Sequence, residues 1–112
     1  MAVTNRLKAI PLELINSTTL DSVNFTAINS PGLPNACSII RIVNDTDESV
    51  EISYYSNTAH DYIPAGGALT LDIGSNKYPN IACMLAKDTI ISVRGTAGTG
   101  FIALAGYYQE VI

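Results

Sequence analysis

Side chains that could take part in catalysis are few in this chain and poorly spaced. His60 is the only histidine, and Asp61 follows it directly. Neighbours on an extended strand point to opposite faces, so these two cannot form an acid–imidazole pair. We expect His60 to be a solvated loop residue. The sequence contains no Gly-x-Ser-x-Gly nucleophile elbow, and carboxylates such as Asp61, Asp72 and Asp88 show no paired spacing. The sequence therefore predicts a protein that is not an enzyme.

Ligands for a metal or a phosphate group are equally sparse. No cluster of cysteine, histidine and carboxylate residues has the spacing of a zinc site. Asp45, Asp47 and Glu48 offer oxygen ligands, but the glycine and distal glutamate of a calcium-binding loop are missing. Residues 95–100 (GTAGTG) lie between two predicted strands and lack the following helix that would bind phosphate. We interpret both segments as turns and expect no metal and no cofactor.

Two cysteines, Cys37 and Cys83, allow at most one internal disulfide. Both have small or apolar neighbours, and the residues after Met1 lack the apolar stretch of a signal peptide. We expect two buried free thiols in a protein made in the cytoplasm, although the sequence leaves open whether they pair.

Tyrosines are the better candidates for a functional role. They occur as two adjacent pairs, Tyr54–Tyr55 and Tyr107–Tyr108, each at the end of a predicted strand. One ring of each pair is expected in the core and its neighbour on the surface. Exposed tyrosine adds contact area at low entropic cost and is enriched in interfaces. The four tyrosines are therefore candidate interface or ligand residues, with a partly buried structural role as the alternative.

The elements that carry these tyrosines are two similar strand–turn–strand segments, residues 38–56 and 89–109. Each has a β-branched and aromatic run, a short break, and a second run that ends in Tyr-Tyr. We interpret each segment as a β-hairpin. The second segment carries apolar residues on both faces, which predicts a central position in the sheet or a subunit contact.

Alternation of apolar and polar residues marks further strands. Ile40 and Ile42 flank Arg41, and the set Val50, Ile52, Tyr54 and the set Leu69, Leu71, Ile73 repeat this pattern. The same parity joins Ile10, Leu12 and Leu14, and also Val23, Phe25 and Ala27, so each set is expected on one face. Pro11 cannot donate to a sheet and predicts an edge or bulged strand. The chain is predicted to be all-β, an antiparallel β-sandwich of jelly-roll or Ig-like type with about eight strands and little helix.

Composition limits the possible partners. The 112 residues fit one domain, and only 14% are charged, with a net charge of −4. The six basic residues are scattered, which argues against nucleic-acid binding, and no apolar run is long enough for a membrane helix. A surface this poor in charge suits a subunit that covers it against copies of itself or a partner. We therefore expect a homo-oligomer or a larger assembly.

Residues 60–72 (HDYIPAGGALTLD) and 94–108 (RGTAGTGFIALAGYY) resemble small β-sandwich virion proteins of tailed bacteriophages, and the likeness covers residues 38–109. The resemblance implies a structural protein of the virion, made in the host cytoplasm. It would bind the phage capsid as a decoration or cement protein; alternatives are a neck, tail or fibre component, or a module that binds a receptor or glycan. Residues 1–30 lie outside the likeness, as an N-terminal arm or an edge strand.

Overall fold

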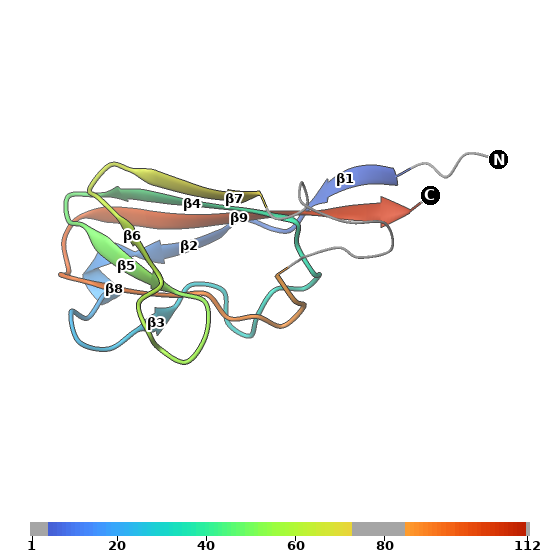
Figure 1. Ribbon diagram of the computed structural model, residues 1–112. Coiled ribbons are helices and arrows are strands. Elements are labelled where there is room, and N and C mark those ends of the chain that lie inside the picture. Colours follow the sequence, from blue (N-terminus) through green and yellow to red (C-terminus); the bar gives the residue numbers. More distant parts are fainter. Residues whose placement is uncertain (1–4, 73–84, 112) are drawn as a thin grey trace.

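The computed structural model describes residues 5–72 and 85–111, which form two antiparallel β-sheets packed face to face (Figure 1). The five-stranded sheet contains β1 (Asn5–Ala9), β2 (Glu13–Asn16), β4 (Ile39–Thr46), β7 (Ala68–Asp72) and β9 (Gly100–Val111). The four-stranded sheet contains β3 (Thr26–Ala27), β5 (Val50–Ser53), β6 (Asp61–Ile63) and β8 (Ser92–Gly95). Within the described residues the only helical segment is the 3-10 turn η1 (Ser17–Thr19). The predicted all-β sandwich is confirmed.

The strand order is that of a jelly roll. One sheet has the order β1/β2–β9–β4–β7 and the other has β3–β8–β5–β6. The pairs are nested: β2 pairs with β9, β3 with β8, β4 with β7, and β5 with β6. A long antiparallel ribbon rolled up on itself gives this nesting, which defines the jelly roll among sandwiches. β1 and β2 follow one another along β9 and act as one interrupted strand. Counted in this way, the jelly-roll topology has eight strands.

Neither predicted hairpin exists. β4 and β5 lie in different sheets, as do β8 and β9. The two segments pair with each other instead: β4 runs antiparallel to β9, and β5 runs antiparallel to β8. An isolated hairpin cannot enclose its own apolar face. Crossing between the sheets places Ile40 and Ile42 on one side of the core and Val50 and Ile52 on the other, all 0–1% exposed.

A buried polar network fixes the turn between β4 and β5. The Asn44 side chain is fully buried, and its Nδ2 lies 2.9–3.2 Å from the carbonyl oxygens of Glu48, Ile63 and Pro64. Its Oδ1 accepts a hydrogen bond of 2.6 Å from the Thr46 hydroxyl. Asn44 thus joins the β4–β5 turn to the β6–β7 turn.

The turn between β8 and β9 packs against the β4–β5 turn. The Asp47 carboxylate accepts a hydrogen bond of 3.0 Å from the Thr99 backbone, and the Ser17 hydroxyl accepts one of 3.0 Å from Gly98. Gly100 has φ +106°, and a Cβ there would collide with the carbonyl oxygen of Asp45. The glycine-rich segment 95–100 is therefore a close-packed corner, and the acidic segment 45–48 binds its neighbour as well as facing solvent.

A β-bulge interrupts the strand at the sheet edge. Ala9 pairs with Tyr107, whereas Glu13 pairs with Leu104, so one extra residue lies on the β1–β2 side. The prediction from Pro11 of an edge or bulged strand is confirmed. The extra residue reverses the side-chain parity, so the prediction that Ile10, Leu12 and Leu14 share a face is wrong. Ile10 is buried, and the two leucines are 62% and 55% exposed.

The predicted strand around Val23, Phe25 and Ala27 is also wrong for most of its length, because only β3 is extended and paired. The Asp21 carboxylate accepts hydrogen bonds from the backbone of Val23 and Asn24, which turns the chain before the strand begins. These bonds favour the charged form and lower the pKa of Asp21. Val23 is consequently 71% exposed.

Other predictions of placement agree with the structure. β8 and β9 are central strands of their sheets. The alternation expected for β7 holds as far as Asp72, while Ile73 lies outside the described residues. Cys37 is a buried free thiol whose pKa burial raises, and Cys83 lies outside the described residues.

Candidate functional site

The four predicted interface tyrosines do not form one site. Tyr54 and Tyr55 follow β5 of the four-stranded sheet, whereas Tyr107 and Tyr108 lie in β9 of the five-stranded sheet. Tyr54 and Tyr108 pack against the core. Tyr55 is 69% exposed, and Tyr107 is half-buried. One ring of each pair thus contacts the core, as predicted, but only Tyr55 offers a widely exposed ring.

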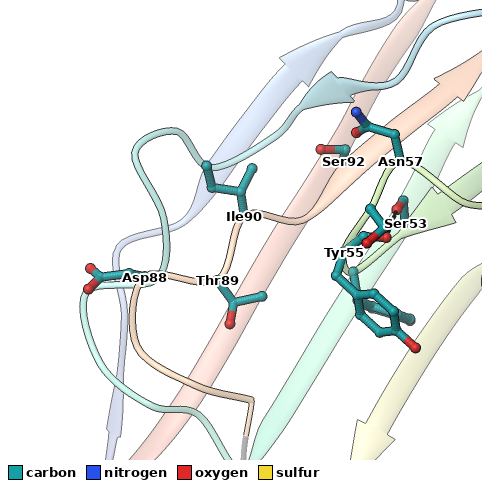
Figure 2. Close-up of a pocket in the computed structure, with 9 residues that line it drawn as sticks. Ser53, Tyr55, Asn57, Asp88, Thr89, Ile90 and Ser92 are labelled. Carbon is teal, nitrogen blue, oxygen red and sulfur yellow. Dashed lines mark hydrogen bonds between the residues drawn. The ribbon is translucent and has the colours of Figure 1, made fainter.

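Tyr55 lies at a cavity of about 420 Å³ that we call the loop pocket. The cavity opens between the segment that follows β5 and the segment that precedes β8 (Figure 2). Its lining residues are Ser53, Tyr54, Tyr55, Ser56, Asn57, Asp88, Thr89, Ile90 and Ser92. Ser53 and Ser92 are directly opposite each other on neighbouring strands. Figure 2 shows Thr89 and Ile90 on one side, with Tyr55 and Asn57 on the other.

His60 holds the tyrosine side of the loop pocket. Its backbone N–H donates to Ile52 at 2.8 Å, and its Nδ1 accepts from the backbone N–H of Tyr54 at 3.1 Å. The second bond places the neutral ring's proton on Nε2. The imidazole lies 4.3 Å from the Tyr55 ring and 5.8 Å from the Tyr54 ring, measured between centroids. His60 is a loop residue, as predicted, but it is half-buried and hydrogen-bonded rather than solvated.

Two further hydrogen bonds fix the same segment. The Ser53 hydroxyl donates to the Tyr55 carbonyl at 3.0 Å, and the Tyr54 hydroxyl donates to the Asp61 carboxylate. Burial and the Asp61 carboxylate both oppose the loss of the phenolic proton, so they raise the pKa of Tyr54 strongly. Tyr54 is a neutral, core-packed anchor beneath the exposed Tyr55.

The opposite wall of the loop pocket is held by Asn29, which is 3% exposed. Its amide donates to the Thr89 carbonyl at 3.1 Å and accepts from the Ile91 backbone at 2.8 Å. Gly32 allows the backbone of Asp88 to approach, since a Cβ there would lie 2.5 Å from the Asp88 carbonyl oxygen. Both walls are thus fixed from behind by buried groups.

All three non-glycine residues with positive φ in the described part of the chain line the loop pocket. Ser56 and Asn57 have φ 59° and 48°, as in the centre of a type I′ turn, and Asp88 has φ 70°. Such conformations cost of order 1–3 kcal/mol and gather at ligand-binding segments more often than elsewhere. Their clustering marks the loop pocket as a candidate binding site.

A second candidate surface is the outward face of the five-stranded sheet, which we call the apolar face. Leu12, Leu14 and Phe101 are 62%, 55% and 47% exposed there. Leu14 lies beside Ala103, which in turn lies beside Val43, so apolar side chains continue across three strands. The other sheet carries an Arg94–Glu51 ion pair of 2.9 Å.

No family model matches the chain, and no curated protein is similar to it in sequence. Among residues 5–72 and 85–111, no group of three His, Cys, Asp or Glu side chains could hold a metal ion. Over the same residues, no helix has the length and apolar character needed to cross a membrane.

Sequence reasoning missed the apolar face, the contacts of Asn29 and the structural role of His60. The apolar face depends on the bulge that reverses the parity of Leu12 and Leu14, and Pro11 was the available signal for it. Asn29 contacts a segment 60–62 residues away, for which the sequence carried no local signal. His60 instead contacts Tyr54 and Tyr55 of its own loop, and its role depends on how that loop folds.

Proposed function

We propose that this protein is a non-enzymatic structural protein of a phage virion, which binds the capsid and stabilises it. Two lines of support come from its architecture and sequence. Jelly rolls recur in viral capsid proteins, an analogy at the level of the fold. Residues 60–72 and 94–108 also resemble virion proteins of tailed phages.

The observation that carries the proposal is the apolar face. Monomeric proteins rarely expose a large continuous apolar patch, and such patches mark interaction surfaces. Here Leu14, Phe101 and the residues between them cover a broad sheet surface rather than a cleft. Although Asp45 lies beside Phe101 and Arg41 lies beside Ala105, the apolar part of this face suits docking on an extended protein surface such as a capsid shell. Contacts that are weak singly would be reinforced by their repetition over a symmetric lattice.

The test is co-sedimentation of the purified protein with capsids of the phage whose genome encodes it. The double variant Leu14→Ser/Phe101→Ser removes two large apolar groups whose side chains already face solvent, so the fold should persist. We expect its apparent affinity for capsids to fall at least about tenfold, because each buried side chain of this size contributes roughly 1.5–3 kcal/mol.

The matched control is Val23→Ser, which removes a 71% exposed apolar side chain outside the apolar face. It should bind capsids as the wild type does. Wild-type protein that ignores capsids, or a double variant that binds them undiminished, would contradict the proposal. Necks and tails sedimented in parallel show whether the partner is another part of the particle.

A further inference from the structure

We propose that the loop pocket binds a neutral saccharide, with one pyranose ring lying against Tyr55. This inference is independent of capsid binding. The loop pocket adjoins Ser53 and Ser92 of the four-stranded sheet, whereas the apolar face belongs to the five-stranded sheet. A protein docked through the apolar face would therefore keep the loop pocket accessible.

Tyr55 supplies the apolar platform that a sugar requires. Its ring is 69% exposed, yet His60 lies 4.3 Å behind it and fixes its orientation. Aromatic rings combine a large apolar surface with a polar tip, which suits the C–H face and hydroxyl rim of a pyranose. Ile90, 42% exposed, adds apolar surface on the facing wall.

Polar groups of the loop pocket remain available for sugar hydroxyls. The side chains of Asn57, Thr89 and Ser92 make no hydrogen bond with any residue in the described part of the chain, although all three line the cavity. An amide and two hydroxyls supply both donors and acceptors, as neighbouring sugar hydroxyls require. Ser92 is only 8% exposed, so a ligand that hydrogen-bonds to its hydroxyl would satisfy a nearly buried polar group.

The size and rigidity of the cavity fit a small ligand. Its volume of about 420 Å³ falls in the usual range of small-molecule sites. Asn29 fixes one wall, and His60 and Ser53 fix the other, so binding requires little ordering of the protein.

The charge of the lining favours a neutral sugar over an acidic one. Among the described residues that line the cavity, Asp88 is the only charged one, and the whole chain carries a net charge of −4. A carboxylated sugar would be repelled by both.

The experiment titrates the isotope-labelled full chain with methyl glycosides of glucose, galactose, mannose and N-acetylglucosamine, and follows backbone NMR shifts. N-acetylneuraminic acid and adenosine are titrated as comparison ligands. We expect at least one neutral glycoside to shift residues 53–57 and 88–92, with a dissociation constant on the order of 1 mM, typical of one small ring. Acidic sugar and adenosine should bind at least about tenfold more weakly.

Two variants test the roles of single side chains. Tyr55→Ala should weaken binding at least about tenfold, and Asn57→Gly should weaken it while keeping the left-handed turn. The control Tyr62→Ala removes a 63% exposed ring outside the lining and should bind normally, as should Leu14→Ser/Phe101→Ser. No shift with any neutral glycoside, a response to adenosine alone, or unchanged binding by folded Tyr55→Ala overturns the proposal.

Discussion

Asn44 shows how one buried side chain can hold several turns together. Its amide faces three carbonyl oxygens and accepts from the Thr46 hydroxyl, with no exposure to water. Removal of the amide would leave the Thr46–Glu48 hydrogen bond of 2.9 Å but would take a donor from the Ile63 and Pro64 carbonyls. A buried group left without a partner costs roughly 1–3 kcal/mol where water cannot enter. We expect Asn44→Ala to lower the free energy of unfolding by about 2–4 kcal/mol, measured by urea denaturation.

The control for this variant is Asn35→Ala, which removes an exposed amide with no partner among the described residues. Its effect should stay within about 0.5 kcal/mol of zero. Equal effects of the two substitutions would show that the Asn44 network does not stabilise the corner.

Tyr54 should give the protein a late ionisation step in alkaline solution. Its folded pKa is raised above the ordinary value of 10.0 by burial and by Asp61. The neutral phenol therefore contributes stability that is fully present below pH 10 and is lost as the pH rises through the folded pKa. In an ultraviolet titration of tyrosinate, one tyrosine of the native protein should ionise well after the exposed rings.

That late step should be missing from Tyr54→Phe, whose stability should also decline less between neutral and strongly alkaline pH. A Tyr55→Phe variant should keep the late step, because Tyr55 is exposed. Loss of the late step from Tyr55→Phe instead would refute the assignment to Tyr54.

At the scale of elements, the corner between β8 and β9 depends on Gly100 for two reasons: its positive φ and its lack of a Cβ atom. Gly100 combines φ +106° with direct contact to the Asp45 carbonyl, whereas Gly66 has φ +73° and open space around it. Gly66→Ala should therefore cost only the backbone strain, about 1–2 kcal/mol. Gly100→Ala adds a steric clash and should cost more than about 3 kcal/mol.

Chemical denaturation of both variants measures the difference. A Gly100→Ala protein as stable as Gly66→Ala would mean that β4 and β9 can separate at the corner without loss of packing. The expected order of stability is wild type, then Gly66→Ala, then Gly100→Ala.

The sequence predicted strands well and their partners poorly. Alternation around Arg41 and along β7 located strands correctly, because one buried and one exposed face produces a period of two. The same pattern cannot tell a turn within a sheet from a turn between sheets. Asp47–Ser49 and residues 96–99 have the composition of hairpin turns, yet each connects the two layers.

The candidate sites were only partly predictable for a related reason. Tyr55 could be identified as an exposed aromatic ring from its position after a core-facing neighbour. The loop pocket also needs Asn29 and Ile90, which are separated from Tyr55 by the β4–β5 turn in one direction and by β7 in the other. Such a site forms only when the jelly-roll topology brings distant segments together, and no pattern within one segment encodes that topology.

At the scale of the whole molecule, low charge and an apolar face together limit solubility. The net charge is −4 at neutral pH and vanishes near pH 4.6. Repulsion between copies is then lost while the apolar attraction remains. We expect light scattering to show strongest self-association near pH 4.6, mediated by the apolar face.

The variant Leu14→Lys/Phe101→Lys should suppress this association when compared at its own, higher isoelectric point. A Val23→Lys protein, altered outside the apolar face, should associate as the wild type does under matched conditions. Equal association of all three proteins would exclude the apolar face as the cause.

The central position of β9 has a consequence for synthesis. β9 pairs with β1, β2 and β4, yet it is the last strand of the sandwich to leave the ribosome. Until then β1 and β2 lack the one partner that they have among the described strands, whereas β4 can already pair with β7. The five-stranded sheet therefore cannot be completed, and the core cannot close, before β9 has been made. A chain that stops before residue 100 could form the four-stranded sheet and the β4–β7 pair, but its core would stay open where β9 is missing.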